Sequence, residues 1–247
     1  MAAVAWPDLK PTPPPSPYAH VTVTAQGRPE ALQRVVCTAF EDAMAERTRL
    51  TREAFLVSGF SGRKFRIFMN ALLGAIPNPR YIEIGLFHGA SFCPAIFKND
   101  LKAVGIDYWP SGYGANPETF MKNLQAFRTE RSDITILDKD FRTVDFTDLG
   151  QFNVLFYDGS HAEKDQYDGI MIPQPALDET SVLVVDDWNW DHVRRGTLNA
   201  LRDAKVTINY TIEVRTSFTN TGLPLVNGPQ SEWHNGCFVA VVTKTGS

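Results

Sequence analysis

Three aspartates stand where two apolar segments of the chain end. The run 152–157 leads into Asp158, and the run 182–185 leads into Asp186 and Asp187. If both runs are strands of one parallel sheet, their carboxyl ends meet at the same edge and bring the three carboxylates together. Carboxylates this close repel one another, and a hard divalent cation such as Mg²⁺ relieves that repulsion. The pattern therefore predicts a Mg²⁺ site at this edge.

A histidine follows the first of these aspartates, in the sequence Asp-Gly-Ser-His. His161 lies three residues after Asp158, and an imidazole takes up a proton near neutral pH, so these two are the candidate catalytic residues. His234 is the reserve candidate for the base. In the structural alternative, one aspartate caps the following helix, another pairs with Arg194 or Arg195, and the histidine only hydrogen-bonds a carboxylate.

A glycine-containing turn follows the strand-like run that begins near residue 80. It contains Glu83, Gly85, Gly89 and Ser91 and leads directly into a helical pattern. Glycines permit close approach of a ligand to the backbone, and free N–H groups at a helix start bind anions. The spacing G-x-x-x-G differs from the dinucleotide fingerprint G-x-G-x-x-G, which disfavours a nicotinamide or flavin enzyme. An ordinary strand-to-helix turn is the other interpretation.

Two further strand ends carry acidic residues that suit a nucleoside. Asp107 lies 22 positions after the first glycine of the turn, where doubly wound folds bind ribose hydroxyls. Tyr108 and Trp109 follow it and either flank an adenine ring or cover the core. Asp140 and Phe141 follow the next run, where a carboxylate either accepts from the adenine amino group or is a solvated loop acid. Together these features indicate a nucleoside-bearing cofactor.

The elements that must position these residues follow from the apolar pattern. We expect strands at 80–84, 102–107, 133–138, 152–158 and 181–186, separated by helices near 90–98, 117–130, 164–171 and 191–204. This alternation predicts an α/β fold with a parallel sheet and crossover helices. Two later runs, 206–215 and 237–243, have no convincing helix between them and predict an antiparallel pair at a sheet edge.

The N-terminal third differs from the rest of the chain in its proline content and in the spacing of its apolar residues. Residues 1–27 predict a proline-rich arm, because the segment 7–17 contains six prolines, which neither join a helix nor donate to a sheet. Residues 28–78 predict a helical cap, with amphipathic spacing from residue 30 and a second helix at 64–75. Residues 79–247 are expected to form the main α/β domain.

Composition excludes several classes of protein. The chain has 247 residues and a net charge of −4, which provides no general basic surface, so nucleic acid is not an expected partner. Cys37, Cys93 and Cys237 are too few and too scattered for a disulfide framework and indicate a reducing compartment. The apolar runs are far shorter than the roughly 18 residues that cross a bilayer, and the start lacks a positively charged signal region. We expect a soluble, cytoplasmic protein with no membrane partner.

The motifs E-x-G-x-x-x-G-x-S, Asp107, D-G-S-H and V-D-D-W occur in this order. The set resembles class I S-adenosylmethionine-dependent methyltransferases, particularly small-molecule O-methyltransferases of the catechol type and metal-dependent sugar O-methyltransferases. The resemblance covers roughly residues 81–201. It implies a Rossmann-like, seven-stranded, mostly parallel sheet with an antiparallel last strand, and a methyltransferase domain over residues 79–247.

The resemblance also implies roles for particular residues. Those expected around S-adenosylmethionine are Glu83, Gly85, Gly89 and Ser91 at the methionine part, Asp107 at the ribose, and Asp140 with Phe141 at the adenine. Asp158, Asp186 and Asp187 match the family's metal ligands. Catechol-type enzymes have Asn at the position of Asp187, and the sugar-methylating relatives share this chain's departure from Asn. The catechol-type general base is a lysine at the position of His161. The segment 55–70 resembles the family's helical cap and is expected to close over cofactor and acceptor.

We therefore expect methyl transfer from S-adenosylmethionine to a hydroxyl of a small molecule, assisted by Mg²⁺. Two alternatives stay open: a metal-independent N- or O-methyltransferase, and a non-catalytic nucleoside-binding module that acts through the proline-rich arm. The sequence does not identify the acceptor of the methyl group, and sugar, catechol, polyketide and amino-acid hydroxyls are all candidates. The loop 222–233 is long enough to line the acceptor pocket. A homo-oligomer is also open, with the first helix and the arm as places for a subunit contact.

Overall fold

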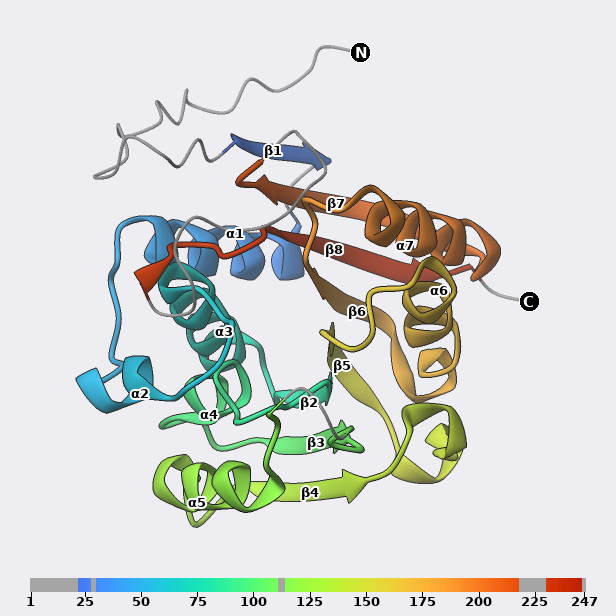
Figure 1. The fold of residues 1–247 in the computed structure, drawn as a ribbon. Coiled ribbons are helices and arrows are strands. Elements are labelled where there is room, and N and C mark those ends of the chain that lie inside the picture. Colours follow the sequence, from blue (N-terminus) through green and yellow to red (C-terminus); the bar gives the residue numbers. More distant parts are fainter. Residues whose placement is uncertain (1–21, 28–29, 111–113, 218–229, 246–247) are drawn as a thin grey trace.

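The computed structural model describes residues 22–27, 30–110, 114–217 and 230–245. Within them the chain forms one eight-stranded sheet with helices on both faces (Figure 1). The strands are β1 (Thr22–Gly27), β2 (Arg80–Ile84), β3 (Lys102–Asp107), β4 (Asp133–Asp138), β5 (Phe152–Tyr157), β6 (Leu177–Asp186), β7 (Val206–Arg215) and β8 (Cys237–Lys244). The helices are α1 (Ala31–Met44), α2 (Arg52–Leu56), α3 (Arg63–Ala75), α4 (Phe92–Ile96), α5 (Pro117–Phe127), α6 (Glu163–Met171) and α7 (Asp191–Asp203), with short 3-10 turns η1 (Phe141–Thr143), η2 (Phe146–Leu149) and η3 (Gln174–Ala176).

Five neighbouring strands are parallel, in the order β6-β5-β2-β3-β4. Every residue of β5 is buried, as expected of a strand covered by helices on both faces. The predicted ranges of β2, β3 and β4 agree with the structure, β5 ends one residue earlier than expected, and β6 begins four residues earlier. The four expected helices are α4, α5, α6 and α7, of which α4 is shorter than the expected 90–98. The α/β fold class is confirmed.

The remaining strands complete the sheet in the antiparallel sense. β7 and β8 pair antiparallel as predicted, and β8 lies between β6 and β7, antiparallel to both. The sheet has one strand more than the seven expected, because residues 22–27, the end of the expected arm, form β1 and pair with the free edge of β7. The proline-rich stretch 7–17 lies outside the described residues.

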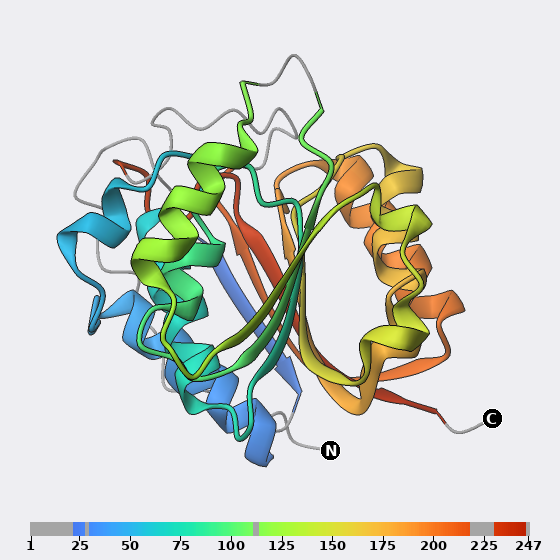
Figure 2. The same ribbon diagram turned by 90° about the horizontal axis from the view of Figure 1, so that it is seen from below.

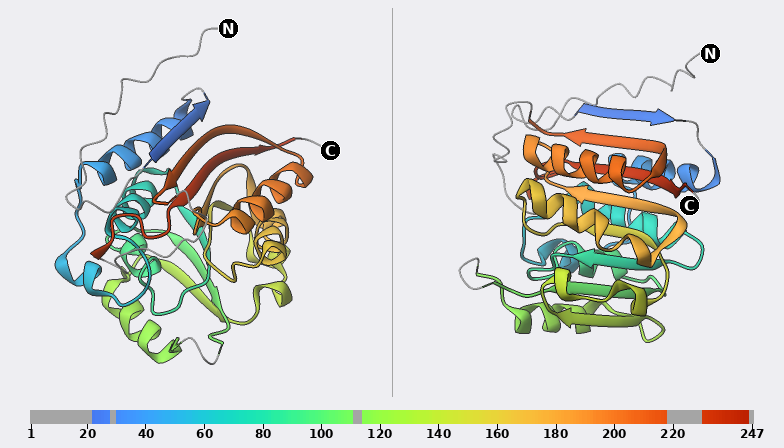
Figure 3. Two further views of the ribbon diagram at one scale, coloured as in Figure 1. Left: turned by 45° about the horizontal axis from the view of Figure 1, so that its top comes forward. Right: turned by 90° about the vertical axis from the view of Figure 1, so that its right-hand side faces the viewer.

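Two helical layers enclose the sheet. α1, α3, α4 and α5 cover one face, and α6 and α7 cover the other (Figure 2). Figure 3 shows α6 and α7 packed side by side in front of the strands. Each face has its own buried apolar cluster, and the three cysteines are free and buried. The helices cover the two faces of the sheet and leave the two ends of its strands uncovered.

The helical segment before β2 belongs largely to the sheet-covering layer. α3 packs against α1 and α4, and Phe68 and Leu72 are fully buried in the same cluster as sheet residues such as Val154. The expectation that 55–70 closes over the ligands therefore applies only to its first part, because α3 lies against the face of the sheet. Among the described residues, no helix is long and apolar enough to cross a membrane.

Candidate active site

The carboxyl end of β5 lies directly beside the glycine turn after β2. The Asp158 N–H donates to the Ile84 carbonyl at 2.8 Å, continuing the parallel pairing of Ile84 with Tyr157. Gly85 has φ +97°, and a Cβ there would overlap the Asp158 carbonyl oxygen. Glycine is therefore required for the turn to pass this close to β5.

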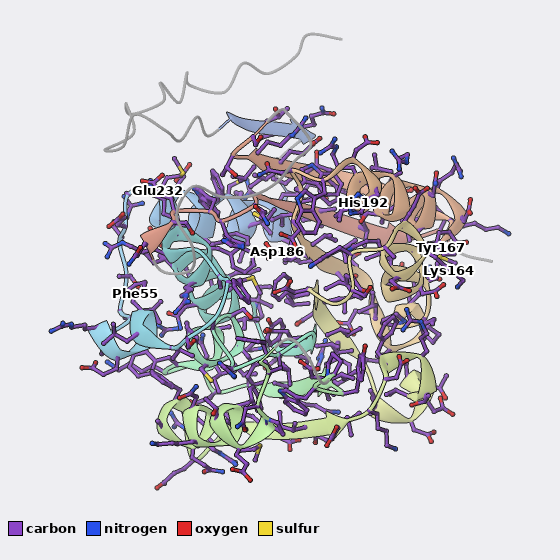
Figure 4. All side chains as sticks on the ribbon, in the orientation of Figure 1. Phe55, Lys164, Tyr167, Asp186, His192 and Glu232 are labelled. Atoms are coloured by element: carbon purple, nitrogen blue, oxygen red, sulfur yellow. The ribbon has the colours of Figure 1, made fainter. Side chains whose placement is uncertain are left out.

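The three predicted aspartates converge at this edge. One carboxylate oxygen from each of Asp158, Asp186 and Asp187 lies within 4.8 Å of the others. Burial, followed by the neighbouring carboxylates, raises the pKa of both Asp158 and Asp186 well above the usual range. A buried cluster of hard oxygen atoms with mutual repulsion suits a divalent cation. The residues present therefore fit Mg²⁺. In Figure 4 Asp186 lies between Glu232, near α1 and α3, and His192 at the start of α7.

Asp187 is contacted on both of its carboxylate oxygens. Nδ1 of His161 lies 3.0 Å from Oδ2, and Nδ2 of Asn235 donates to Oδ1 at 2.7 Å. Burial opposes ionisation of Asp187, but these two contacts outweigh it and lower its pKa. Trp190 packs edge-on against the His161 ring at 4.7 Å between centroids. The imidazole thus lies with its Nδ1 side against Asp187, and Nε2 is the ring nitrogen that does not face this carboxylate.

The arginines of the structural alternative have other partners. Arg194 donates to the carbonyls of Trp188 and Asn189 at 2.7 and 2.6 Å. Arg195 pairs with Asp191 and Glu163 on the surface of α6 and α7. Arg194 thus closes the loop after β6 and helps to fix the direction of the preceding aspartates.

Glu83 is fully buried at the end of β2. Its carboxylate accepts hydrogen bonds from the hydroxyls of Tyr81 and Ser91, so two of the residues predicted at the methionine part are directly in contact. Burial raises the pKa of Glu83 to about 8, although the two hydroxyls oppose the shift. Gly89 has φ +88° and packs against Cys93, which completes the turn into α4.

Asp107 organises the loops at the carboxyl ends of β2 and β3. Its Oδ2 accepts from the N–H groups of Leu86 and Phe87 at 2.8 and 2.9 Å, and Oδ1 accepts from the Trp109 N–H at 2.7 Å. Oδ2 therefore already accepts two hydrogen bonds, whereas Oδ1 accepts one and has a second lone pair that can accept from a ligand hydroxyl. Tyr108 is 54% exposed beside this carboxylate, whereas the Trp109 indole donates to the Phe87 carbonyl and is partly buried.

Asp140 and Phe141 lie after β4, separate from the aspartate cluster. Asp140 caps η1 by accepting from the Arg142 N–H at 3.0 Å and also pairs with the Arg142 guanidinium. The Phe141 ring is 5% exposed and packs edge-on against Tyr157 in the core of the α6 and α7 face. Asp140 therefore has a structural role at this position, and the Phe141 ring is engaged in core packing.

Sequence reasoning missed the residues that position the start of α3. Arg66 is fully buried, and its guanidinium donates to the carbonyls of Ala54, Phe55, Val57 and Ser61 at 3.0–3.2 Å. One arginine thus holds the whole turn between α2 and α3. The only sequence signal was an arginine on the apolar face of a helical pattern.

This turn places Phe60 over the site. Its side chain is 57% exposed, and its ring lies 5.4 Å from that of Phe87 and 6.1 Å from that of His234. His234 is buried beside Asp187, and burial lowers its pKa. Phe60 therefore contacts both the loop after β2, through Phe87, and the turn before β8, through His234. Of the predicted acceptor loop 222–233, the structure describes only residues 230–233.

Residues 82–188 match the model of a family described as a methyltransferase domain. A search of curated proteins found no match. Among solved structures, the cofactor-bound Rv0187 from MTB is 18% identical over 88% of this chain and 92% of that chain, with a TM-score of 0.53. A provisionally named O-methyltransferase from Klebsiella pneumoniae is 12% identical over 87% and 91%, with a TM-score of 0.51.

The matched segment includes the glycine turn, Asp107, His161 and the three clustered aspartates. At these low identities the solved structures bear on the fold alone. The chain therefore has the fold of class I S-adenosylmethionine-dependent methyltransferases, and its residues 82–188 match the model of a methyltransferase domain.

Proposed function

We propose that the protein is an S-adenosylmethionine-dependent methyltransferase that methylates a hydroxyl of a small molecule with the help of a divalent cation. The observation that carries this proposal is the position of Asp158. It lies against Gly85 of the turn assigned to the cofactor and within 4.8 Å of Asp186 and Asp187. A methyl donor and a cation-bound acceptor would therefore lie side by side.

The cofactor would lie along the carboxyl ends of β2, β3 and β4. Glu83, Gly85, Gly89 and Ser91 are assigned to the methionine part, Asp107 to the ribose, and Tyr108 to a face of the adenine ring. Asp140 with Phe141 is also assigned to the adenine, in addition to the cap of η1 and the core packing that these two residues provide. Support comes from the tight turn that Gly85 and Gly89 form at positive φ and from the free lone pair on Oδ1 of Asp107. The cofactor itself supplies a sulfonium methyl group that is already reactive, so the protein's task is alignment and exclusion of water.

The acceptor hydroxyl would be oriented by the aspartate cluster. Mg²⁺ held by Asp158, Asp186 and Asp187 would polarise that hydroxyl and ease loss of its proton. His161, held at Nδ1 by Asp187, would receive the proton at Nε2 as the oxygen attacks the methyl carbon. Phe60 would cover the acceptor and limit access of water.

One observation favours a second candidate, a metal-independent methyltransferase. His161 lies 3.0 Å from Asp187, the arrangement expected of a general base and its orienting carboxylate, and such a pair would remove a proton without a cation. In that case Asp158 and Asp186 would orient an amine or hydroxyl directly.

Two measurements test the proposal. Calorimetry should show binding of S-adenosylhomocysteine to the full chain, and absence of binding with and without Mg²⁺ would refute the methyltransferase assignment. Turnover should be lost in EDTA, recover with Mg²⁺, and fall at least 100-fold in Asp186→Asn. Full activity in chelator would instead establish the metal-independent candidate.

A further inference from the structure

Asn235 lies in a tight turn that the sheet register places beside Asp187. β8 pairs with β6 so that Asp186 is opposite Cys237, two residues after Asn235. The Asn189 N–H donates to the Asn235 carbonyl at 2.9 Å, which ties this turn to the loop after β6. Asn235 is 4% exposed, so its side chain is enclosed at the aspartate cluster.

The orientation of the Asn235 amide is determined by its partner. Nδ2 donates to Oδ1 of Asp187 at 2.7 Å, and a carboxylate oxygen only accepts hydrogen bonds, so the NH₂ group must be the one that faces it. Oδ1 of Asn235 is bonded to the same carbon as Nδ2 and therefore also lies close to the cluster. This oxygen is buried and has no hydrogen-bond partner among the described residues.

The surroundings of this oxygen select what can bind it. A buried carbonyl oxygen without a partner is unfavourable, so a ligand that contacts it gains binding free energy. Beside three carboxylates, the favoured ligand is a cation. Asparagine oxygens, like carboxylates, are suitable ligands for hard divalent cations.

We propose that Asn235 is a fourth protein ligand of the cation site, with its amide oxygen on the cation and its amide N–H on Asp187. This inference rests on the cation of the proposed function. Together with Asp158, Asp186 and Asp187, it supplies four protein oxygens and leaves two positions of an octahedral ion for acceptor hydroxyls or water. Asn235 thereby favours an acceptor that offers at most two oxygens to the cation.

The test measures Mn²⁺ binding to the full chain by electron paramagnetic resonance, without any acceptor. Asn235→Ala should weaken Mn²⁺ binding at least 10-fold and leave S-adenosylhomocysteine affinity within about 2-fold, because the cofactor residues lie on other strands. Asn209→Ala is the matched control. It removes an amide that donates to Thr243 on the same β7 and β8 ribbon, and it should change neither affinity.

Asn235→Asp separates the two functions of the amide, since it keeps an oxygen and removes the N–H donor. It should bind Mn²⁺ within about 3-fold of the wild type. A loss as large as that of Asn235→Ala would mean that the amide acts only through Asp187 and would overturn the inference. Unchanged Mn²⁺ affinity in Asn235→Ala would also overturn it while leaving the proposed function intact.

Two further results use only the wild-type protein and so do not depend on the stability of the variants. If the wild type binds no Mn²⁺, both this inference and the metal-assisted part of the proposed function fail, whereas S-adenosylhomocysteine binding still reports on the methyltransferase assignment. In wild-type protein labelled with ¹³Cγ-asparagine, electron-nuclear double resonance should show a coupling between bound Mn²⁺ and one asparagine carbon. Absence of that coupling refutes direct ligation by Asn235.

Discussion

Replacing Glu83 with glutamine should change how the stability of the cofactor-free protein depends on pH. Burial raises the pKa of the Glu83 carboxyl from about 4.5 to about 8. The folded protein therefore keeps a proton on Glu83 that the unfolded chain releases above about pH 4.5. Stability from this group is fully present below that pH and is lost as the pH rises through 8.

The size of the effect follows from the same two values. Between pH 5 and pH 8, linkage predicts a loss of about 3–4 kcal/mol in the free energy of unfolding from Glu83 alone. Glutamine has no proton to lose and similar volume, so Glu83→Gln should lack this part of the pH dependence. Asp158 and Asp186 titrate in both proteins, and an ionised Glu83 repels them in the wild type, so the comparison measures the ionisation of Glu83 together with this repulsion.

Urea denaturation of the wild type and Glu83→Gln at pH 5, 6.5 and 8 measures this difference. The wild type should lose about 3–4 kcal/mol relative to the variant over that range. Glu179→Gln, at an exposed glutamate of β6, should follow the wild type. Parallel pH profiles for the wild type and Glu83→Gln would show that Glu83 is ionised in the folded protein, and the reasoning from burial would be refuted.

Three further substitutions test the positioning of the site. Gly85→Ala should prevent stable folding, because the new Cβ would overlap the Asp158 carbonyl. Gly114→Ala is the control for backbone strain, since Gly114 has φ +72° but open space around it. Equal thermal melting of the two variants would contradict the overlap. Asp107→Asn should weaken S-adenosylhomocysteine binding at least 10-fold by calorimetry, since charged hydrogen bonds contribute about 1.5–3 kcal/mol; an affinity within 2-fold of wild type would remove Asp107 from the cofactor site. Arg66→Met should lower the free energy of unfolding by at least about 3 kcal/mol, because it leaves four carbonyls without their donor; a loss below 1 kcal/mol in urea titrations would mean that water replaces the guanidinium.

The parallel part of the fold was accessible from the sequence because its strands are apolar and end in recognisable polar residues. A run such as 152–157, followed by Asp-Gly-Ser-His, determines both where β5 ends and where the site begins. β1 was missed because its sequence, TVTAQG, has a weak apolar pattern and follows the proline-rich segment. Its strand conformation depends on pairing with the edge of β7, which is a long-range contact.

Part of the candidate site was also predictable from the strand ends. Asp158, Asp186 and Asp187 were brought together by a rule about parallel strand ends, and the structure confirms that they lie together. Asn235 and Arg66 were not predictable, because their roles depend on contacts that only tertiary packing creates. For Asn235 the needed information was the register of β8 against β6.

Backbone strain locates the site independently of any motif. In the part of the chain that the structure describes, eight non-glycine residues have positive φ. Three of them, Glu46, Lys98 and Lys205, follow the ends of helices, where this conformation is common. A fourth, Asn78, belongs to the residue type that tolerates it best.

The other four positive-φ residues, Phe87, Trp109, Asp187 and His234, all lie at the carboxyl edge of the parallel strands. Asp187 and His234 are of residue types that also adopt this conformation more often than most, whereas Phe87 and Trp109 are not. Strain of this kind costs about 1–3 kcal/mol at each position and persists only where specific contacts offset it. Those contacts are present: Asp107 accepts from Phe87 and Trp109, and Asn235 donates to Asp187. The same side chains that we assign to cofactor and cation therefore also stabilise the backbone around them, so loss of either carboxylate or amide should loosen the loops at this edge before it affects the sheet.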